Sequence, residues 1–284
     1  MLELEAVFYR SLPVLPTQIR SGGEQAARVI GRLLADEVSR ATAGIDPAQI
    51  GFSMVVSTIM DMPFTSGWLR WESIRAEITR HCVHVPQNFT ASYECAGWGY
   101  ALDYAARRTP QATYALILVA DLNILDISFW RGDPNWGASG FGISAVLLRL
   151  PPVEERNGVV SVAQSSQGMG EFCVDLRKWL AKTPEGLANV PYLPVEMAGI
   201  YSHFLPMDRV MPDLHAQWGH CFGSDTWISY ITHLEGGLLQ PGQVHTATSA
   251  SLRGYWAMTK LRLSPTVRYG FVDGTGASTL QVAS

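Results

Sequence analysis

The sequence predicts an α/β protein built from two similar halves, and three observations carry this prediction. Segments with the pattern of strands alternate with segments of helical spacing along the whole chain. The halves repeat an order of elements, since "GIDPAQIGFSMVVST" is matched in style by "LPVEMAGIYSH", and "ECAGWGYALDYAARR" by "GHCFGSDTWISYITHLEGG". The 284 residues, 47% hydrophobic and 16% charged, can bury one large core or two closely packed halves. A duplicated unit of this kind packs two sheets between helical layers.

The first half, residues 1–150, begins with the strand pattern "LEAVFYRSL". A helix is predicted over 24–42, because apolar and small residues recur at helical spacing and Gly44 follows. The next elements are a strand in "IGFSMVVST", a helix over about 66–80, a strand in "VHVPQNF", a helix over 96–108, and strands in "YALILVA" and "ISAVLLRL". The proline and charge cluster "PPVEERNG" indicates a boundary near 151–158.

The second half, residues 151–284, carries fewer elements. They are a strand in "VVSVAQS", a helix over about 174–181, a strand in "EMAGIYSH", a short helix over about 208–217, a helix over about 225–235, and strands in "QVHTATSA" and "YWAMTKLRL". In each half, a residue of reactive type stands at a helix start and a strand follows the helix. We therefore expect the active site where the helix starts of the two halves converge.

Charge and cysteine usage narrow the class of protein. A formal charge of -4 gives no electrostatic reason to expect nucleic acid or an anionic membrane as partner. No apolar run reaches the roughly 18 residues of a membrane span, and the first residues lack the pattern of a signal peptide. The four cysteines show no C-x-x-C spacing; they are Cys82, Cys95, Cys173 and Cys221. We expect a cytoplasmic protein with free thiols.

Cys95 stands between a strand end and a predicted helix in "TASYECAGWGYALDYAARR". A thiol is a strong nucleophile as thiolate, and the N–H groups and partial positive charge of a helix start lower its pKa. The small Ala96 and Gly97 leave space around the sulfur, and nearby backbone N–H groups could hold the oxyanion of a thioester intermediate. A buried structural cysteine is the alternative. Position alone leaves both roles open.

Several stretches together resemble the β-ketoacyl-acyl-carrier-protein synthase III branch of the thiolase-like superfamily. They are "GIDPAQIGFSMVVST", "ECAGWGYALDYA", "YALILVAD", "GASGFGISAVLL" and the late "GH", "SD" and "EGGLLQPGQV". The resemblance covers residues 24–150 well and 195–262 more loosely. It implies a five-layer αβαβα fold, usually in a homodimer, whose cysteine takes an acyl group from a coenzyme A or carrier-protein thioester. Cys95 occupies the position of that cysteine.

The resemblance also implies two partner positions in the second half. His203, in "IYSHFLP", matches the family's histidine at a strand end, although Phe-Leu follows in place of Gln-Ala. His220, in "WGHCFGSD", stands where the family pattern has Asn in a Gly-Asn step. Both side-chain types can donate to a thioester carbonyl, but only histidine can accept a proton from an attacking hydroxyl or amine.

Asp225 follows His220 by five residues and could orient its imidazole, which gives a triad with Cys95. A helix N-cap is the alternative role, because Ser224 or Asp225 precedes "TWISYITHL". The triad resembles acyltransferase offshoots of the synthase III family in polyketide pathways, which move an acyl group to oxygen or nitrogen. We therefore predict acyl transfer in secondary metabolism.

Two other functions stay open. Cys95, His203 and His220 would also satisfy the cysteine and two histidines of condensing enzymes, in which both imidazoles bind a malonyl thioester during decarboxylation. A non-catalytic partner subunit of a thiolase-like heterodimer is the third possibility. It is supported by the direct passage from "RSLPVLPTQIRSGG" into the first helix, without the family's N-terminal segment that helps to hold coenzyme A.

The expected partners follow from the same features. We expect a homodimer, or a heterodimer with a thiolase-like chain, and an acyl-CoA or acyl carrier protein thioester as substrate, with no bound cofactor or metal. The short start of the chain favours a carrier-protein donor. Basic side chains of the first two helices could meet an acidic carrier or form solvated faces; they are Arg28, Arg32, Arg40, Arg70, Arg75 and Arg80.

Overall fold

The computed structural model describes residues 1–109, 111–152, 155, 158–272 and 281–282. Its first half contains β1 (Leu2–Ser11), α1 (Gly23–Ala41), β2 (Ile50–Val56), α2 (Asp61–Thr65), α3 (Trp71–His81), β3 (Asn88–Thr90), α4 (Gly97–Arg108), β4 (Tyr114–Asp121), β5 (Gly132–Asp133), β6 (Gly137–Ala138) and β7 (Gly142–Arg149). Its second half contains β8 (Gly158–Val162), α5 (Gly168–Lys182), α6 (Val195–Phe204), α7 (His215–Trp218), α8 (Asp225–Glu235), β9 (Val244–Ala250), β10 (Tyr255–Val272) and β11 (Gln281–Val282).

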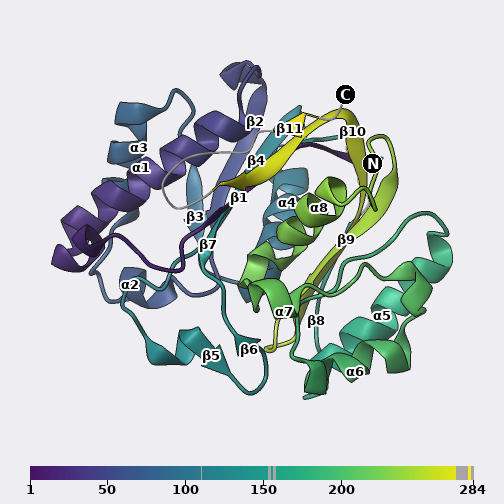
Figure 1. The fold of residues 1–284 in the computed structure, drawn as a ribbon. Helices are drawn as coiled ribbons and strands as arrows, with labels where there is room; N and C mark the ends of the chain where they lie inside the picture. Colours follow the sequence, from purple (N-terminus) through teal and green to yellow (C-terminus); the bar gives the residue numbers. More distant parts are fainter. Residues whose placement is uncertain (110, 153–154, 156–157, 273–280, 283–284) are drawn as a thin grey trace.

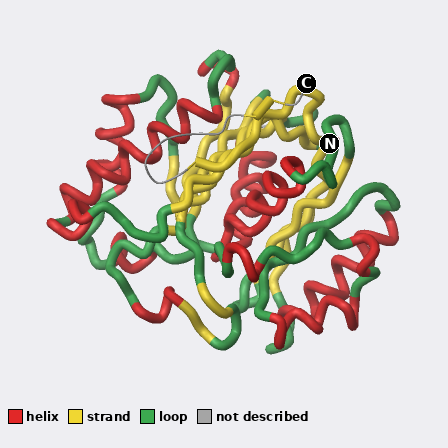
Figure 2. Tube along the Cα trace, in the orientation of Figure 1, coloured by secondary structure: helices red, strands yellow, loops and turns green. Residues whose placement is uncertain are grey.

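These elements form five layers, in the order helix, sheet, helix, sheet, helix (Figure 1). Helices α1 and α3 pack together, and α1 covers one face of β1, β4 and β7. Helices α4 and α8 lie in the middle of the molecule, where they contact strands of both halves (Figure 2). Helices α5 and α6 pack on each other, and α5 contacts β10 from the outer side. The expected five-layer αβαβα architecture is confirmed.

Strand β10 joins the two sheet layers. Within the described residues, the main sheet has nine strands in the order β11-β10-β1-β7-β4-β2-β3, with β8 and β9 also paired to β10. The first part of this 18-residue strand pairs with β8 and β9, and its later part pairs in parallel with β1. The β1–β10 register shifts where Leu4 pairs with Leu263 and Ala6 with Arg268. The two expected sheets are therefore two parts of one continuous sheet.

Helix α8 is buried along nearly its whole length, whereas α4 buries its first turn and a face of small residues. Trp98 of α4 and Trp227 of α8 are fully buried and meet edge to face, with ring centroids 5.1 Å apart. Gly99 permits the close approach of α4 to β10, since a Cβ there would lie 2.1 Å from the Cβ of Ala257. Close packing of this kind fixes the starts of both helices relative to the sheet.

Several predicted elements are confirmed and two are wrong. In place of the short helix expected over about 208–217, the structure has the 3-10 helix Met207–Arg209 and helix α7, separated by residues outside any helix. The helices expected over 24–42, 96–108 and 225–235 are α1, α4 and α8. The strand expected in "EMAGIYSH" is instead helix α6. Tyr201 and other apolar residues of α6 pack in one cluster with residues of α5, so this segment buries its apolar side chains against another helix. A short apolar run can form either a strand or a helix, and packing against α5 selects the helix here.

The predicted boundaries moved in other places. The second helix begins at Trp71, after a turn in which Gly67 has a φ of 72°. The strand in "VHVPQNF" is confined to Asn88–Thr90. Part of the boundary expected near 151–158 lies outside the described residues, and the division into halves at residue 150 stays a prediction.

All four cysteines are free. In the ranges that the structure describes, no helix has the length and apolar character needed to cross a membrane.

Candidate active site

Cys95 lies in a short 3-10 helix, Glu94–Ala96, that leads directly into α4. The turn before it is tight, because Tyr93 and Glu94 take left-handed backbone conformations with φ of 68° and 47°. Such conformations cost roughly 1–3 kcal/mol each in non-glycine residues and cluster at functional sites. The carbonyl of Cys95 accepts a hydrogen bond from the hydroxyl of Ser249 in β9. The predicted position at a helix start is confirmed, and the side chain is 6% exposed.

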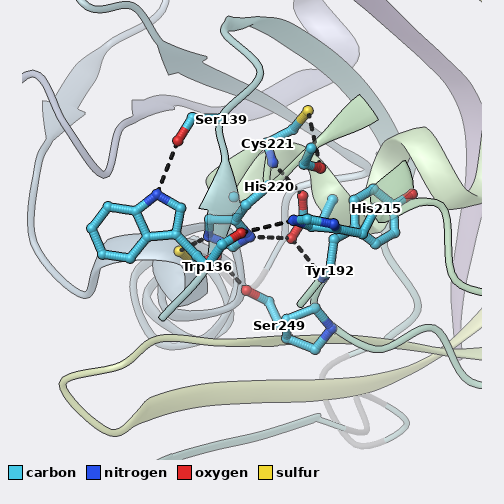
Figure 3. Close-up of polar contacts among 12 residues, drawn as sticks. Trp136, Ser139, Tyr192, His215, His220, Cys221 and Ser249 are labelled. Atoms are coloured by element: carbon cyan, nitrogen blue, oxygen red, sulfur yellow. Dashed lines mark hydrogen bonds and ion pairs between the residues drawn. The ribbon is translucent and has the colours of Figure 1, made fainter. Parts of the chain in front are cut away.

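His220 approaches the thiol from the second half. Its Nε2 lies 3.7 Å from Sγ of Cys95 (Figure 3). The end of β6 and the residues after it hold the backbone of His220. The N–H of His220 donates to the carbonyl of Ala138 at 2.8 Å, and its carbonyl accepts from the N–H of Gly140 at 3.0 Å. Gly219 makes this close pairing possible, because its φ is 67° and a Cβ there would lie 2.5 Å from the Ala138 oxygen.

Asp225 orients the imidazole from the first turn of α8. Its Oδ2 lies 2.8 Å from Nδ1 of His220 and also accepts the N–H of Tyr192 at 2.9 Å. Its Oδ1 accepts the N–H of Cys221 at 2.6 Å. The N-cap position of α8 belongs to Ser224, which makes no side-chain capping bond. The carboxylate of Asp225 is therefore directed at the histidine rather than used as a cap.

The electrostatics of the three groups are coupled. Burial opposes a charge on His220, but the Asp225 carboxylate and the contact with Cys95 outweigh it and raise the pKa of His220 well above its usual value. Burial raises the pKa of the Cys95 thiol, and the hydrogen bond to His220 works in the opposite direction. An imidazole that holds its proton firmly can stabilise a thiolate beside it, so this arrangement suits a cysteine nucleophile.

His203 is not brought to this site. It lies exposed near the end of α6, where its ring meets Phe204 edge to face at a centroid distance of 5.0 Å. Helix α6 packs on α5 in an outer layer, whereas the thiol lies at the start of a middle helix. The expectation that His203 occupies a strand end beside Cys95 is wrong, because these residues form a helix. Cysteine and two histidines are therefore not assembled together.

Asp121, the last residue of β4, is a site residue that the sequence analysis missed. Its carboxylate accepts the N–H of Thr58 at 2.6 Å, the hydroxyl of Ser57 at 3.1 Å and the N–H of Gly223 at 3.2 Å. The hydroxyl of Thr58 lies 3.9 Å from Sγ of Cys95. Burial raises the pKa of Asp121 to about 6, against these hydrogen bonds. The sequence does contain a signal for this residue, because an acidic side chain directly after the apolar strand pattern "YALILVA" lies at a buried strand end.

A cavity of about 280 Å³ opens beside Cys95 and His220. The segment between β4 and β7 and the turn before α8 supply its aromatic lining, which consists of Phe129, Trp130, Trp136 and Phe222. The second half adds apolar side chains, namely Met169, Pro191, Leu193, Ala250 and Leu252. Charged lining residues are Glu94, Asp133 and Arg253. The reactive groups thus face a small and mostly apolar space.

No site for a metal ion emerges from the described part of the chain, since it holds no cluster of three His, Cys, Asp or Glu side chains fit to bind one. The reactive groups that the described residues bring together at the site are the Cys95 thiol, the His220 imidazole and the Asp225 carboxylate.

Comparison with known proteins gives matches among solved structures alone. No protein family model and no curated protein matches the sequence. ChlB3, an acyltransferase, matches with a TM-score of 0.63 and 15% identity over 93% of this chain and 99% of its own. AbyA1, a tetronic acid condensing enzyme, matches with a TM-score of 0.61 and 13% identity over 91% of this chain and 100% of its own.

A third structure is 3-oxoacyl-(acyl carrier protein) synthase III from Pseudomonas aeruginosa PAO1. It matches with a TM-score of 0.54 and 15% identity over 93% of this chain and 96% of its own. Identities this low establish the fold and leave the reaction open. The layers, the continuous sheet and these three structures together show that the chain has the thiolase-like fold of the synthase III type.

Proposed function

We propose that this protein is an acyl-thioester enzyme that carries an acyl group on Cys95 and transfers it to a hydroxyl or amine in secondary metabolism. The observation that carries the proposal is the line of contacts from Cys95 Sγ to His220 Nε2 at 3.7 Å and from His220 Nδ1 to Asp225 Oδ2 at 2.8 Å. Nucleophile, base and orienting carboxylate stand in the order that acyl transfer requires.

In the first step, the thiolate of Cys95 attacks the carbonyl carbon of the donor thioester. A new carbon–sulfur bond forms, the bond to the donor sulfur breaks, and the departing thiolate takes the proton from His220. In the second step, neutral His220 accepts the proton of the acceptor hydroxyl or amine as that group attacks the acyl carbon. The thiolate of Cys95 leaves, and the charged imidazole beside it is stabilised by Asp225, which restores the starting state.

Decarboxylative condensation is the weaker alternative for two reasons. His203 lies on an exposed helix, so the second imidazole of a condensing set is not at hand. Among the described residues that line the cavity, the cations are His220, which is paired with Asp225, and Arg253, which is 78% exposed and paired with Glu94 at 2.9 Å. A malonyl carboxylate would therefore meet two acidic side chains and no unpaired cation in this lining.

A role as a non-catalytic subunit fits the site poorly. His220 and Asp225 form a buried pair, and burying charged groups costs several kcal/mol per ion before the pairing is counted. The strained turn before Cys95 adds to that cost. A chain whose task was to complete another subunit would need neither feature.

We propose an acyl-CoA or carrier-protein thioester as the donor and a thiolase-like dimer as the assembly. Part of the basic charge expected to meet a carrier is already paired within the chain. Arg32 and Arg80 both bind Glu77, and Arg40 binds Glu37. The remaining exposed set is Arg28, Arg70 and Arg75. With only three of the six arginines unpaired in this way among the described residues, α1 and α3 are less strongly supported as a surface that binds a carrier protein.

The test of function follows acyl groups by intact mass. Incubation with acyl thioesters should give one acyl adduct, which Cys95→Ala should lose. His220→Asn should still form the adduct, but more slowly, because the thiolate loses the charged imidazole beside it. Transfer to an acceptor should be lost, because an amide cannot accept the proton. His203→Asn is the matched control and should leave both steps unchanged. An adduct that persists in Cys95→Ala, or carbon dioxide released in step with turnover of a malonyl thioester, would contradict the proposal.

A further inference from the structure

The four aromatic side chains that line the cavity form one connected surface, which we call the aromatic wall: Phe129, Trp130, Trp136 and Phe222. Ring centroids lie 4.9 Å apart for Phe129 and Trp130, 5.1 Å for Phe129 and Trp136, and 6.0 Å for Trp130 and Phe222. Exposure rises from 3% at Phe222 and 7% at Trp136 to 50% at Phe129. The wall therefore runs from the depth of the cavity to its mouth.

Trp136 is held in a fixed orientation beside the proposed base. Its Nε1–H donates to the hydroxyl of Ser139 at 2.9 Å, and its carbonyl accepts from Nε2 of His215 at 2.8 Å (Figure 3). The centroid of its ring lies 6.5 Å from that of His220. Since these bonds set the ring before any substrate arrives, binding against it costs little ordering of the protein.

The wall reaches the nucleophile itself. Phe222 belongs to a small buried cluster with Cys95, Ile59 and Phe141, and Trp130 packs against that cluster. The proton-transfer partner of the thiol also touches the wall, because the ring centroids of His220 and Phe222 lie 5.1 Å apart. An acyl group attached to the sulfur would start its course against aromatic faces.

The size of the cavity limits what can be carried there. Its volume of about 280 Å³ lies just below the roughly 300–1,000 Å³ of small-molecule sites. A single ring attached to the sulfur fits such a space. A rigid ring also loses less conformational entropy on burial than a flexible chain of equal carbon number.

We propose that the acyl group carried on Cys95 is compact, uncharged and aromatic, and that the aromatic wall selects it. This inference rests on the proposed acyl-enzyme. Aromatic pairs gain about 0.5–1.5 kcal/mol beyond the area they bury, which corresponds to a preference of about 2- to 12-fold for each ring contact. The wall offers such contacts to an incoming ring and no partner for a charge.

The test compares S-benzoyl and S-heptanoyl N-acetylcysteamine, whose acyl groups have equal carbon number. The rate of Cys95 acylation is followed by intact mass, and each rate constant is divided by that of the same thioester with free cysteine. This ratio removes the intrinsic reactivity of the acyl group. We expect the native protein to favour benzoyl by about 10-fold, the product of two or three ring contacts.

Three variants locate the preference. Trp136→Leu should remove most of it, Trp136→Phe should keep most of it, and Phe129→Leu should lower it by about 3-fold, the value of one ring contact. Tyr104→Leu is the matched control, because Tyr104 is 41% exposed on α4 and does not line this cavity. Because Phe129 is exposed, Phe129→Leu should fold even if the variants of the buried Trp136 do not.

The outcomes separate this inference from the function on which it rests. Acylation of Cys95 with equal or higher preference for heptanoyl overturns the aromatic selection and leaves the acyl-enzyme intact. If neither thioester acylates the thiol, the proposed function falls. Calorimetric binding of both thioesters to Cys95→Ala then decides the inference, since tighter benzoyl binding that is lost in Phe129→Leu supports the wall and equal binding overturns it.

Discussion

Two turns meet at the candidate site, and they are built alike although they carry different chemistry. A 3-10 helix precedes α4, and another, Phe222–Ser224, precedes α8. Each turn contains non-glycine residues in the left-handed region, namely Tyr93 and Glu94 in the first and Phe222 in the second. The first turn supplies the thiol. The second places a carboxylate so that it orients a histidine just upstream in the chain.

The difference between the turns shows how one scaffold serves two roles. Cys95 and His220 are 125 residues apart in sequence, yet their side chains meet because the two turns contact each other and Trp98 meets Trp227 at the helix starts. Asp121 bonds to Gly223 in the second turn and to Thr58, whose hydroxyl lies near the thiol of the first. Substitutions in either turn, or in this link, should have graded and separable effects.

The largest effect is expected from removing the base of the second turn while keeping its shape. His220→Asn should lower the rate of transfer from the acyl-enzyme by about 10²- to 10⁴-fold, the usual contribution of general base catalysis. Single-turnover transfer from preformed acyl-enzyme, followed by intact mass, measures this step. A fall in transfer of less than 10-fold would contradict the proposed base.

The second-largest effect is expected from removing the carboxylate that orients His220. Asp225→Ala leaves His220 and two backbone N–H groups buried without their acceptor. Breaking a buried pair from one side costs about 3–5 kcal/mol in the free energy of unfolding. Urea denaturation measures the change, with the exposed Asp208→Ala as matched control. Similar midpoints for both variants would count against a buried, structured pair.

Asp121, which links the two turns, should make the free energy of unfolding depend on pH. The folded-state pKa of Asp121 is about 6, above its ordinary value of 3.8, so the folded protein binds the proton more tightly. The resulting stabilisation is present below about pH 4 and is lost as the pH rises through 6. Relative to Asp121→Asn, the free energy of unfolding of the native chain should therefore fall by about 2 kcal/mol between pH 4 and 7. A difference that stays constant over this range would contradict the shift.

The pH dependence of transfer should report the base itself. His220 must be neutral to accept a proton, and its pKa lies well above the ordinary 6.5 because of Asp225. Transfer should therefore rise with pH, up to about 10-fold per unit, along a limb placed above 6.5. Rates of the second step across a pH series measure it, and the limb should vanish in His220→Asn. A limb at or below pH 6 would show that another group titrates.

The smallest effect is expected outside both turns. His203→Ala should change the free energy of unfolding by less than about 0.5 kcal/mol, because an exposed side chain loses few contacts. Acylation and transfer should stay at native rates in the assays above. A marked loss of transfer would return His203 to the site and revive the condensing alternative.

The sequence by itself determined the features that depend on neighbours along the chain. The α/β alternation followed from local periodicity. The position of Cys95 at a helix start followed from the small residues and helical pattern after it. The nearness of His220 and Asp225 follows from a separation of five residues across one turn, which keeps a pair close in many conformations.

Only the tertiary structure decided the rest, because those features depend on contacts between distant segments. The run "MAGIY" fits a buried strand or a helix, and packing on α5 made it α6, which carries His203 away from the thiol. Strand β10 joins the two sheet layers because it pairs with β1 and β8, which are distant in the chain, as well as with its neighbour β9. The aromatic wall is assembled from the segment between β4 and β7 and from Phe222 in the turn before α8. Local pattern fixes an element's type when periodicity is clear, but only packing chooses its neighbours.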